Sequence, residues 1–84
     1  MIGMFAVSMA GHDKGQMYII IREDDEYFYL SDGWIRPVEK PKKKKKKHVQ
    51  LMKSGINEAL ADKLRNAQTI YNEEIKFAIK VRAK

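Results

Sequence analysis

Short apolar runs separated by turn residues fill the first half of the chain. Residues 5–9 alternate in the period of a half-buried strand, and residues 17–21 form an apolar run rich in β-branched side chains. Residues 27–30, 34–36 and 48–52 are three further strand-like segments that follow turn signals or polar stretches. Five short strands over about 50 residues predict a small barrel, because closure removes exposed sheet edges.

The last third of the chain has the spacing of helices instead. All five glycines and both prolines lie within the first 55 residues, and apolar residues such as Leu60 and Leu64 then recur on one helical face. Asn57 and Asn72 each precede an acidic residue, which is the signal for a helix start. The segment between them is weakest at 66–72, so the pattern predicts two helices rather than one continuous rod.

These patterns predict one compact domain that is mainly β with an α-helical tail. The sheet part covers residues 1–53 and includes a basic loop at 40–48, and the helical extension covers residues 54–84. At this length, folding buries only about 60–65% of the surface that the unfolded chain exposes, so the expected stability is modest.

The aromatic residues of the third strand divide between two faces. Because neighbouring residues of a strand alternate, we expect Phe28 in the core and Tyr27 with Tyr29 on the opposite face. Aromatic side chains are scarce core material in so small a domain, and Trp34 is interpreted as a packing residue or loop anchor. None of the four is taken as a binding site.

Composition excludes several functional classes. The 84 residues include no cysteine, so disulfides, Cys-based zinc sites and thiol catalysis are ruled out. No apolar run reaches the ~18–20 residues of a membrane span, and the first residues lack the features of a signal peptide, so we expect a cytoplasmic protein. His12 and His48 form no recognisable catalytic or metal-binding arrangement. We therefore expect no enzymatic activity, cofactor, metal or small-molecule substrate.

Charge is the most informative property. Seventeen Lys and Arg against eleven Asp and Glu give a net charge of +6, and seven of the lysines lie at 40–48, where no acid occurs. The remaining residues are nearly neutral, so the basicity is one local feature that suits a polyanionic partner. Six consecutive like charges predict a solvated loop or extension. Two alternative roles for the run are a loop that only improves solubility and a contact with anionic lipid. The charge of the run alone does not show whether a nucleic-acid partner would be RNA or DNA.

The segment from Gly3 to Met52 combines several motifs: a strand at 5–9, the sequence Ala-Gly-His-Asp-Lys-Gly at 10–15, the apolar strand at 17–21, Asp-Gly at 32–33 followed by Arg36, and Pro-Lys-Lys-Lys at 41–44 closing with Lys47-His48. In this combination it bears a resemblance to the KOW-motif proteins, and in particular to the bacterial relatives of the fourteen-e type of large-subunit ribosomal proteins. It covers about 50 of the 84 residues. His12 stands where an arginine is common in the family.

The resemblance implies an SH3-like barrel of five strands that binds ribosomal or another structured RNA through its loops. The RNA-binding residues carried over by position or by charge are Lys14, Arg36, Lys40, Lys42, Lys43, Lys44, Lys45, Lys46, Lys47 and His48. The structural turn residues are Gly11, Gly15 and Gly33. If six lysines each neutralise one phosphate, log K falls with log[salt] at a slope of about −4 to −5.

The expected function is that of a non-enzymatic RNA-binding protein of the translation apparatus, with structured RNA or the large ribosomal subunit as partner. The alternative is a KOW-type protein-interaction module of the transcription or translation machinery. In that case the tail at 54–84 would bind another protein, and the lysines would be accessory. The tail has no family residue to transfer, and its apolar residues most simply pack on the barrel.

Overall fold

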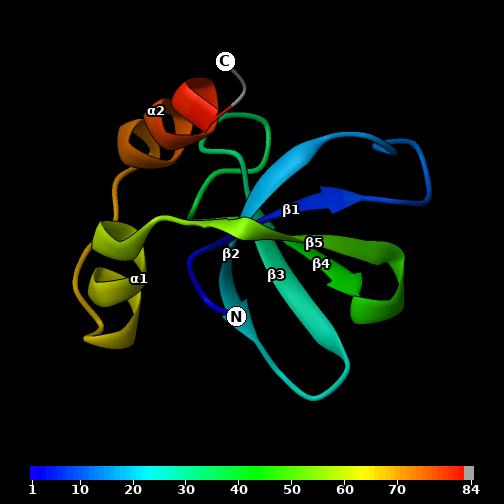
Figure 1. The fold of residues 1–84 in the computed structure, drawn as a ribbon, viewed down its shortest axis with the longest axis horizontal. Coiled ribbons are helices and arrows are strands. Elements are labelled where there is room, and N and C mark those ends of the chain that lie inside the picture. The colour runs from blue at the N-terminus through cyan, green and yellow to red at the C-terminus, as the bar shows by residue number, and fades with distance from the viewer. Residues whose placement is uncertain (83–84) are drawn as a thin grey trace.

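Five strands and two α-helices make up the described part of the chain (Figure 1). The computed structural model describes residues 1–82, except for the side chains of residues 53–56. The strands are β1 (Met4–Ser8), β2 (Met17–Glu23), β3 (Tyr27–Ser31), β4 (Lys42–Lys45) and β5 (Val49–Ile56). The helices are a short 3-10 turn, η1 (Lys46–His48), and the α-helices α1 (Glu58–Arg65) and α2 (Asn72–Arg82). The predicted fold class, mainly β with a helical tail, is confirmed.

The strands form one antiparallel sheet whose order forces it to curl. The order is β4-β3-β2-β1-β5, so β4 and β5 are the two edges. These two strands are nevertheless joined by the three residues of η1, a connection that spans at most about 14 Å. The edges must approach each other at this end, and the sheet is a half-barrel (Figure 1).

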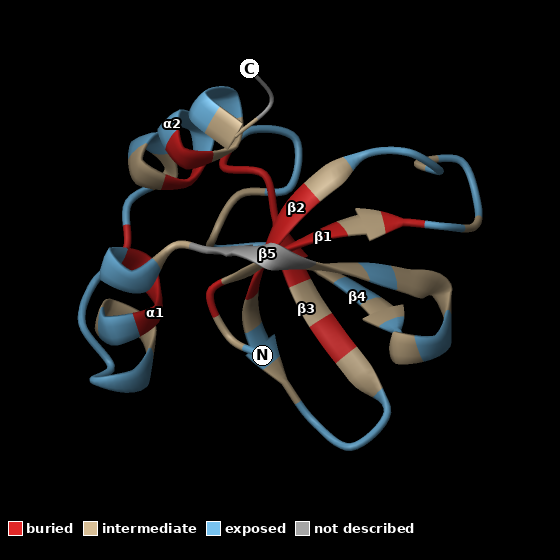
Figure 2. Cartoon of the chain, in the orientation of Figure 1, coloured by how far each residue is buried: buried red, intermediate tan, exposed pale blue. Residues whose placement is uncertain are grey.

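Both faces of the sheet are buried where the helices lie against it. The inner face holds a cluster made from strand residues alone: Ala6, Tyr18, Ile20, Phe28 and Leu30. The outer face packs against the helices through Phe5, Ile19, Leu60, Ile70, Ile75 and Ala78 (Figure 2). In the predicted strand at 5–9, Ala6 and Ser8 are buried on the inner side, whereas the outer side runs from buried Phe5 to exposed Met9.

The fourth strand is the lysine run and not residues 34–36. Asp32 closes residues 32–36 into a loop, since its Oδ1 accepts the N–H groups of Trp34 and Arg36 at 2.9 and 2.8 Å. An Asp side chain that binds backbone two and four residues on competes with strand pairing. Trp34 is 72% exposed, so its predicted packing role is also wrong. The fourth strand is β4 instead, which pairs with β3 in a register that sets Lys42 opposite Leu30.

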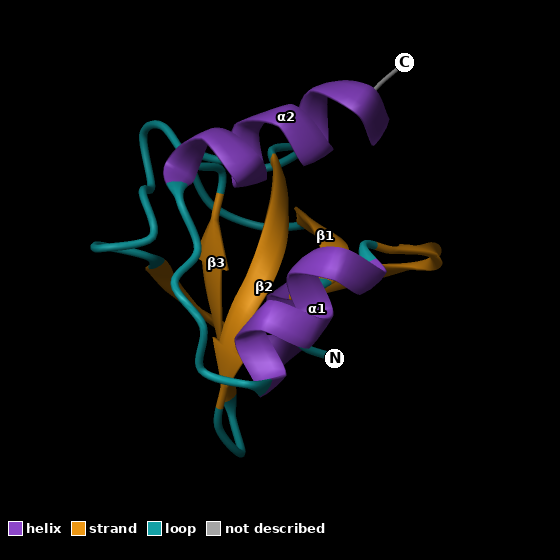
Figure 3. Cartoon of the chain, turned by 90° about the vertical axis from the view of Figure 1, so that its left-hand side faces the viewer, coloured by secondary structure: helices purple, strands orange, loops and turns teal. Residues whose placement is uncertain are grey.

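The helical tail forms two helices, as predicted. The Asn57 side chain accepts the N–H of Leu60 and caps α1. The helix ends where Ala67 adopts a positive φ of 55°, and the N–H of Gln68 then bonds to the Lys63 carbonyl, as in a Schellman motif. Both helices lie on the same side of the sheet (Figures 1 and 3). Within residues 1–82, neither has the length and apolar content to cross a membrane.

The loop after β3 is pressed directly against α2. Gly33 has a φ of +75°, and a Cβ built on it would lie 2.4 Å from the Asn72 carbonyl oxygen. A side chain there would meet both steric overlap and backbone strain. The N–H of Val38 also donates to Asn72 Oδ1 at 2.7 Å. Residues 32–38 and the start of α2 are thus one packed unit.

We expect Ile75→Ala to lower the free energy of unfolding by about 2–5 kcal/mol, because Ile75 is fully buried between α2 and the sheet. Urea denaturation followed by circular dichroism measures the change. Val81→Ala is the matched control on the same helix, since Val81 is exposed and its truncation should change stability by no more than about 0.5 kcal/mol. Equal effects of the two substitutions would contradict the observed packing of α2.

Candidate nucleic-acid interface

Strand geometry divides the lysine run into two sets. Lys42, Lys44 and Lys46 are half-buried, whereas the three lysines that alternate with them, Lys43, Lys45 and Lys47, are exposed. Successive residues of a strand point to opposite faces, which accounts for the alternation over β4. The predicted solvated loop is therefore wrong. The run is an ordered edge strand, because the half-buried lysines find acidic partners.

Asp13 is the main partner of the half-buried lysines. Its carboxylate lies 3.0 Å from Lys44 Nζ and 3.3 Å from Lys42 Nζ. It also accepts hydrogen bonds from the Ser8 hydroxyl at 2.8 Å and the Tyr18 hydroxyl at 2.7 Å. Lys44 Nζ donates in addition to the Ala10 carbonyl at 2.8 Å. These contacts join the turn at 10–15 to β4 and leave Asp13 with a full set of donors.

The same contacts shift two pKa values. Burial favours the protonated form of Asp13, but the hydrogen bonds from Tyr18, Lys44, Ser8 and Lys42 outweigh it and hold the pKa of the carboxyl well below its usual range. Burial, followed by the hydrogen bond to Asp13, raises the pKa of the Tyr18 hydroxyl well above its usual value. Asp13 is therefore ionised and Tyr18 neutral at physiological pH.

Glu23 holds the third half-buried lysine. Lys46 Nζ donates to Glu23 Oε1 at 3.1 Å, and the backbone N–H of Lys46 donates to the Glu26 carbonyl at 2.9 Å. Burial alone would raise the pKa of Glu23, but the hydrogen bond from Lys46 leads the contacts that bring it below its usual value. The half-buried lysines are thus engaged in ion pairs within the protein, with two carboxylates shared among three lysines, and they are less available to a ligand than the exposed ones.

A layer of cations and tyrosines covers the exposed side of β2, β3 and β4. The ammonium of Lys43 lies 4.3 Å from the ring centre of Tyr27, and the guanidinium of Arg22 lies 4.3 Å from that of Tyr29. The tyrosines share a face opposite the buried Phe28, as predicted. Sequence reasoning missed these residues as a surface. The sequence pattern did not indicate that β4 pairs with β3, and this pairing is what places the lysines over the tyrosines.

The turn at 10–15 and the loop at 32–36 meet at one end of the sheet. His12, Ile35, Arg36 and Lys42 line a hollow of about 330 Å³ between them, together with residues of the network around Asp13. Lys14 and Lys40 are exposed on the turn and on the segment before β4, and His48 is half-buried in η1. Gly11, Gly15 and Gly33 have positive φ angles, as their turns require.

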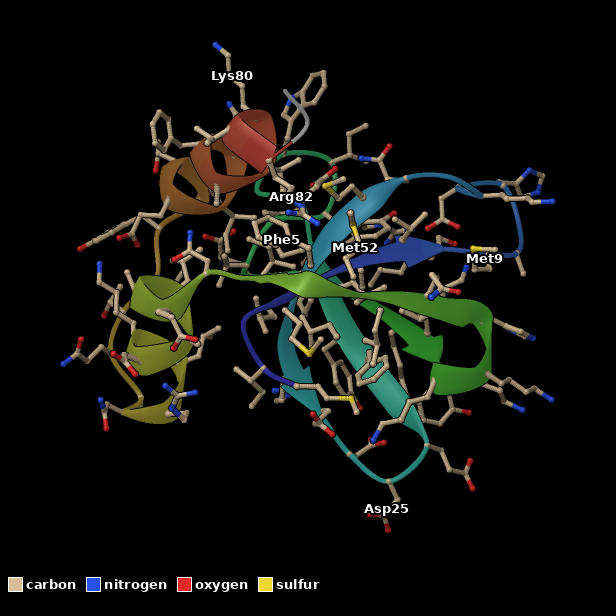
Figure 4. The ribbon with its side chains drawn as sticks, in the orientation of Figure 1. Phe5, Met9, Asp25, Met52, Lys80 and Arg82 are labelled. Atoms are coloured by element: carbon tan, nitrogen blue, oxygen red, sulfur yellow. The ribbon has the colours of Figure 1, made fainter. Side chains whose placement is uncertain are left out.

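Acidic residues gather at the opposite end of β2. Asp24, Asp25 and Glu26 form the hairpin between β2 and β3, and Asp25 points away from the molecule at its tip (Figure 4). The hairpin and the turn at 10–15 lie at the two ends of the same strand. Lys43 lines a hollow with these three acids and Tyr27, and Lys45 and Lys47 line a second hollow with Glu26. The hairpin therefore places negative charge beside the exposed lysines of the run.

Comparison with known proteins adds no family assignment. No protein-family model matches the sequence, and a search of the curated proteins finds no significant match. The resemblance to the KOW-motif proteins stays a prediction from the residues. Among residues 1–82, no three His, Cys, Asp or Glu side chains come together in a way that could hold a metal ion.

Asp13→Asn should lower the free energy of unfolding by about 2–4 kcal/mol, because it removes the charge that Lys42 and Lys44 share. Chemical denaturation at neutral pH measures the effect. Asp25→Asn is the matched control, since Asp25 is exposed at a hairpin tip, and it should change stability by no more than about 0.5 kcal/mol. If Asp13→Asn left the free energy of unfolding unchanged, β4 would be held by its backbone pairing with β3 alone.

The stability of the protein should also fall on acidification in a way that depends on Asp13. Its pKa is lower in the folded than in the unfolded chain, so its contribution is complete above the unfolded value of about 3.9 and is lost as the pH falls below it. Denaturation of wild type and Asp13→Asn at several pH values between about 6 and 2 measures this. The stability difference between them should shrink toward the acid end, and a constant difference would contradict the assignment.

Proposed function

We propose that this protein is a non-enzymatic RNA-binding protein of the translation apparatus, with structured RNA, foremost ribosomal RNA, as its partner. The observation that carries the proposal is the division of the lysine run. Lys43, Lys45 and Lys47 are exposed while the alternate lysines are paired with Asp13 and Glu23. An ordered set of cations on one edge, beside tyrosine rings, suits a phosphate backbone.

Binding would proceed by neutralising phosphates. Each lysine that contacts a phosphate releases condensed counterions, so affinity falls as salt rises. Exposed Lys14, Arg36 and Lys40 extend the cationic surface from β4 toward the turn at 10–15 and the loop at 32–36. Phosphate contacts position the protein but carry no sequence information, so the shape of the RNA would supply specificity. This function needs no cofactor, and with ribosomal RNA as partner its site of action is the cytoplasm.

A protein-interaction module is the second candidate. It is favoured by the exposed apolar side chains of the helical tail, Tyr71, Phe77 and Val81. In a small domain such exposure is typical of a surface that another molecule covers. Under this function the tail would keep its partner when the exposed lysines are removed.

The proposal predicts that the three exposed lysines of the run account for a distinct part of the salt dependence of binding, beside the part due to Lys14, Arg36 and Lys40. Replacing Lys43, Lys45 and Lys47 by Gln should reduce the slope of log K against log[salt] by about 2–3, at ~0.7–0.9 per phosphate contact. Affinity for purified large ribosomal subunits, measured by co-sedimentation between about 50 and 200 mM monovalent salt, gives the slope. This change is smaller than the value for six lysines, because three of them are engaged inside the protein.

The alternate lysines provide the matched control. Replacing Lys42, Lys44 and Lys46 by Gln removes the same number of charges from the same lysine run, but it removes them from ion pairs with Asp13 and Glu23. That variant should lose stability in a thermal melt, whereas the exposed-lysine variant should melt near wild type. An unchanged salt slope in the exposed-lysine variant would rule the proposal out, and retention of a protein partner by that variant would favour the second candidate.

A further inference from the structure

A groove with aromatic walls and a basic rim lies between the loop at 32–36 and α2. Its volume is about 330 Å³, and it is lined by Gln16, Asp32, Trp34, Lys76, Phe77, Ile79 and Lys80. Trp34 and Phe77 are 72% and 69% exposed, so two large aromatic side chains face solvent beside the same groove. The function proposed above makes no use of it.

The loop that carries Trp34 is held in place before any ligand arrives. Asp32 Oδ1 accepts the N–H groups of Trp34 and Arg36, and the Ser31 hydroxyl accepts the N–H of Gly33 at 3.1 Å and donates to the Arg36 carbonyl at 2.8 Å. Gly33 is packed against Asn72, which fixes the loop to α2. A fully bonded loop thus displays an exposed indole, an arrangement that lowers the ordering cost of binding.

The rim of the groove is positively charged. Lys76 and Lys80 are one turn apart on α2, and Lys80 extends outward from the helix (Figure 4). Asp32 is the one acid among the described lining residues, and it is 8% exposed and engaged with the loop backbone. Ligands with a flat apolar face and flanking negative charge fit this combination of rings and cations.

The groove is continuous with the end of the sheet where the turn at 10–15 lies. Gln16 and Asp32 line both the groove and the hollow that contains His12, Arg36 and Lys42. A strand of RNA that contacts Arg36 and Lys42 in this hollow could therefore pass over these two residues and reach Trp34 without leaving the protein surface.

We propose that the groove takes an unpaired nucleotide of the bound RNA. The base stacks on Trp34 against the Phe77 side of the groove, and Lys76 and Lys80 contact the phosphates on either side of it. Stacking on an aromatic ring tolerates any base, because every base has a π-face. This inference rests on the proposed RNA binding and deepens it, since it makes α2 a part of the interface and makes an unpaired nucleotide the feature that is recognised.

Trp34 is the sole tryptophan of the chain and reports directly on its own groove. Two labelled, blunt-ended RNA duplexes serve as probes, one fully paired and one that differs from it only by a single bulged nucleotide. Fluorescence anisotropy of the label measures binding, and tryptophan emission measures contact at Trp34. We expect the bulged RNA to quench the emission with the same midpoint as its anisotropy, while the paired RNA leaves the emission unchanged.

Substitutions at the groove test the same point by affinity. Trp34→Leu should weaken binding of the bulged RNA by about 5–100-fold, as expected for loss of one stacked base, and should leave the paired RNA unaffected. Trp34→Phe keeps a ring and should restore most of the loss. Tyr71→Leu is the matched control, because Tyr71 is an exposed aromatic that does not line the groove. A loss with Lys76→Gln and Lys80→Gln together would support the phosphate contacts.

The outcomes separate this inference from the function beneath it. If neither RNA changes the anisotropy, RNA binding itself is wrong and the inference falls with it. If both RNAs bind with unchanged tryptophan emission, and Trp34→Leu keeps full affinity, RNA binding stands but the groove does not hold a base. That second result would overturn the inference, and a protein segment would then be the favoured occupant of the groove. Equal quenching by the paired RNA would likewise overturn the role of an unpaired nucleotide.

Discussion

The carboxylate of Asp13 is the contact on which the placement of the basic strand depends. Four consecutive lysines have low strand propensity and repel one another, so backbone pairing with β3 acts against the side chains. Asp13 reverses this balance by binding Lys42 and Lys44 together, while Ser8 and Tyr18 supply donors that keep it ionised. Because Asp13 lies in the turn at 10–15, the same contact joins the turn to β4 and sets the relative position of two predicted binding elements.

Docking the run into the sheet changes what the lysines can do. In a mobile loop, each residue would lose about 1–2 kcal/mol of backbone entropy on being ordered by a ligand, whereas in β4 that loss occurs on folding. Same-face residues of a strand stand about 6.6–6.8 Å apart, so Lys43 and Lys45 are spaced much like neighbouring phosphates on an RNA strand. The half-buried lysines meanwhile serve as structural cations. A run that looks uniform in the sequence thus has two separate uses.

Local patterns predicted most of the fold, and contacts distant in sequence account for what they missed. The antiparallel sheet, the break between the helices, the cap at Asn57 and the start of α2 at Asn72 follow from periodicity and turn chemistry within a few residues. The lysine strand could not be predicted in this way. The repulsion between its lysines is evident from the local sequence, but Asp13, which offsets that repulsion, lies about thirty residues away along the chain. The cation–tyrosine layer was missed for the same reason. The loop at 32–36 has strand-like residues, but the side chains of Asp32 and Ser31 bond its backbone into a closed loop in place of strand pairing.

A lysine-rich edge strand also has a simpler use, since it prevents pairing with the edge of another sheet. To prevent such pairing, the strand must be charged and the surface around it must not favour association with another protein. The loop at 32–36 does the reverse, because it exposes Trp34 and Ile35 on a rigid support at the same end of the sheet as the turn at 10–15. Another β-sheet edge would be repelled by β4, and a purely apolar partner would desolvate the surrounding cations without pairing them. A polyanion that carries flat, unpaired bases satisfies both surfaces at once, which is the physical reason for favouring RNA over protein as the ligand of this face.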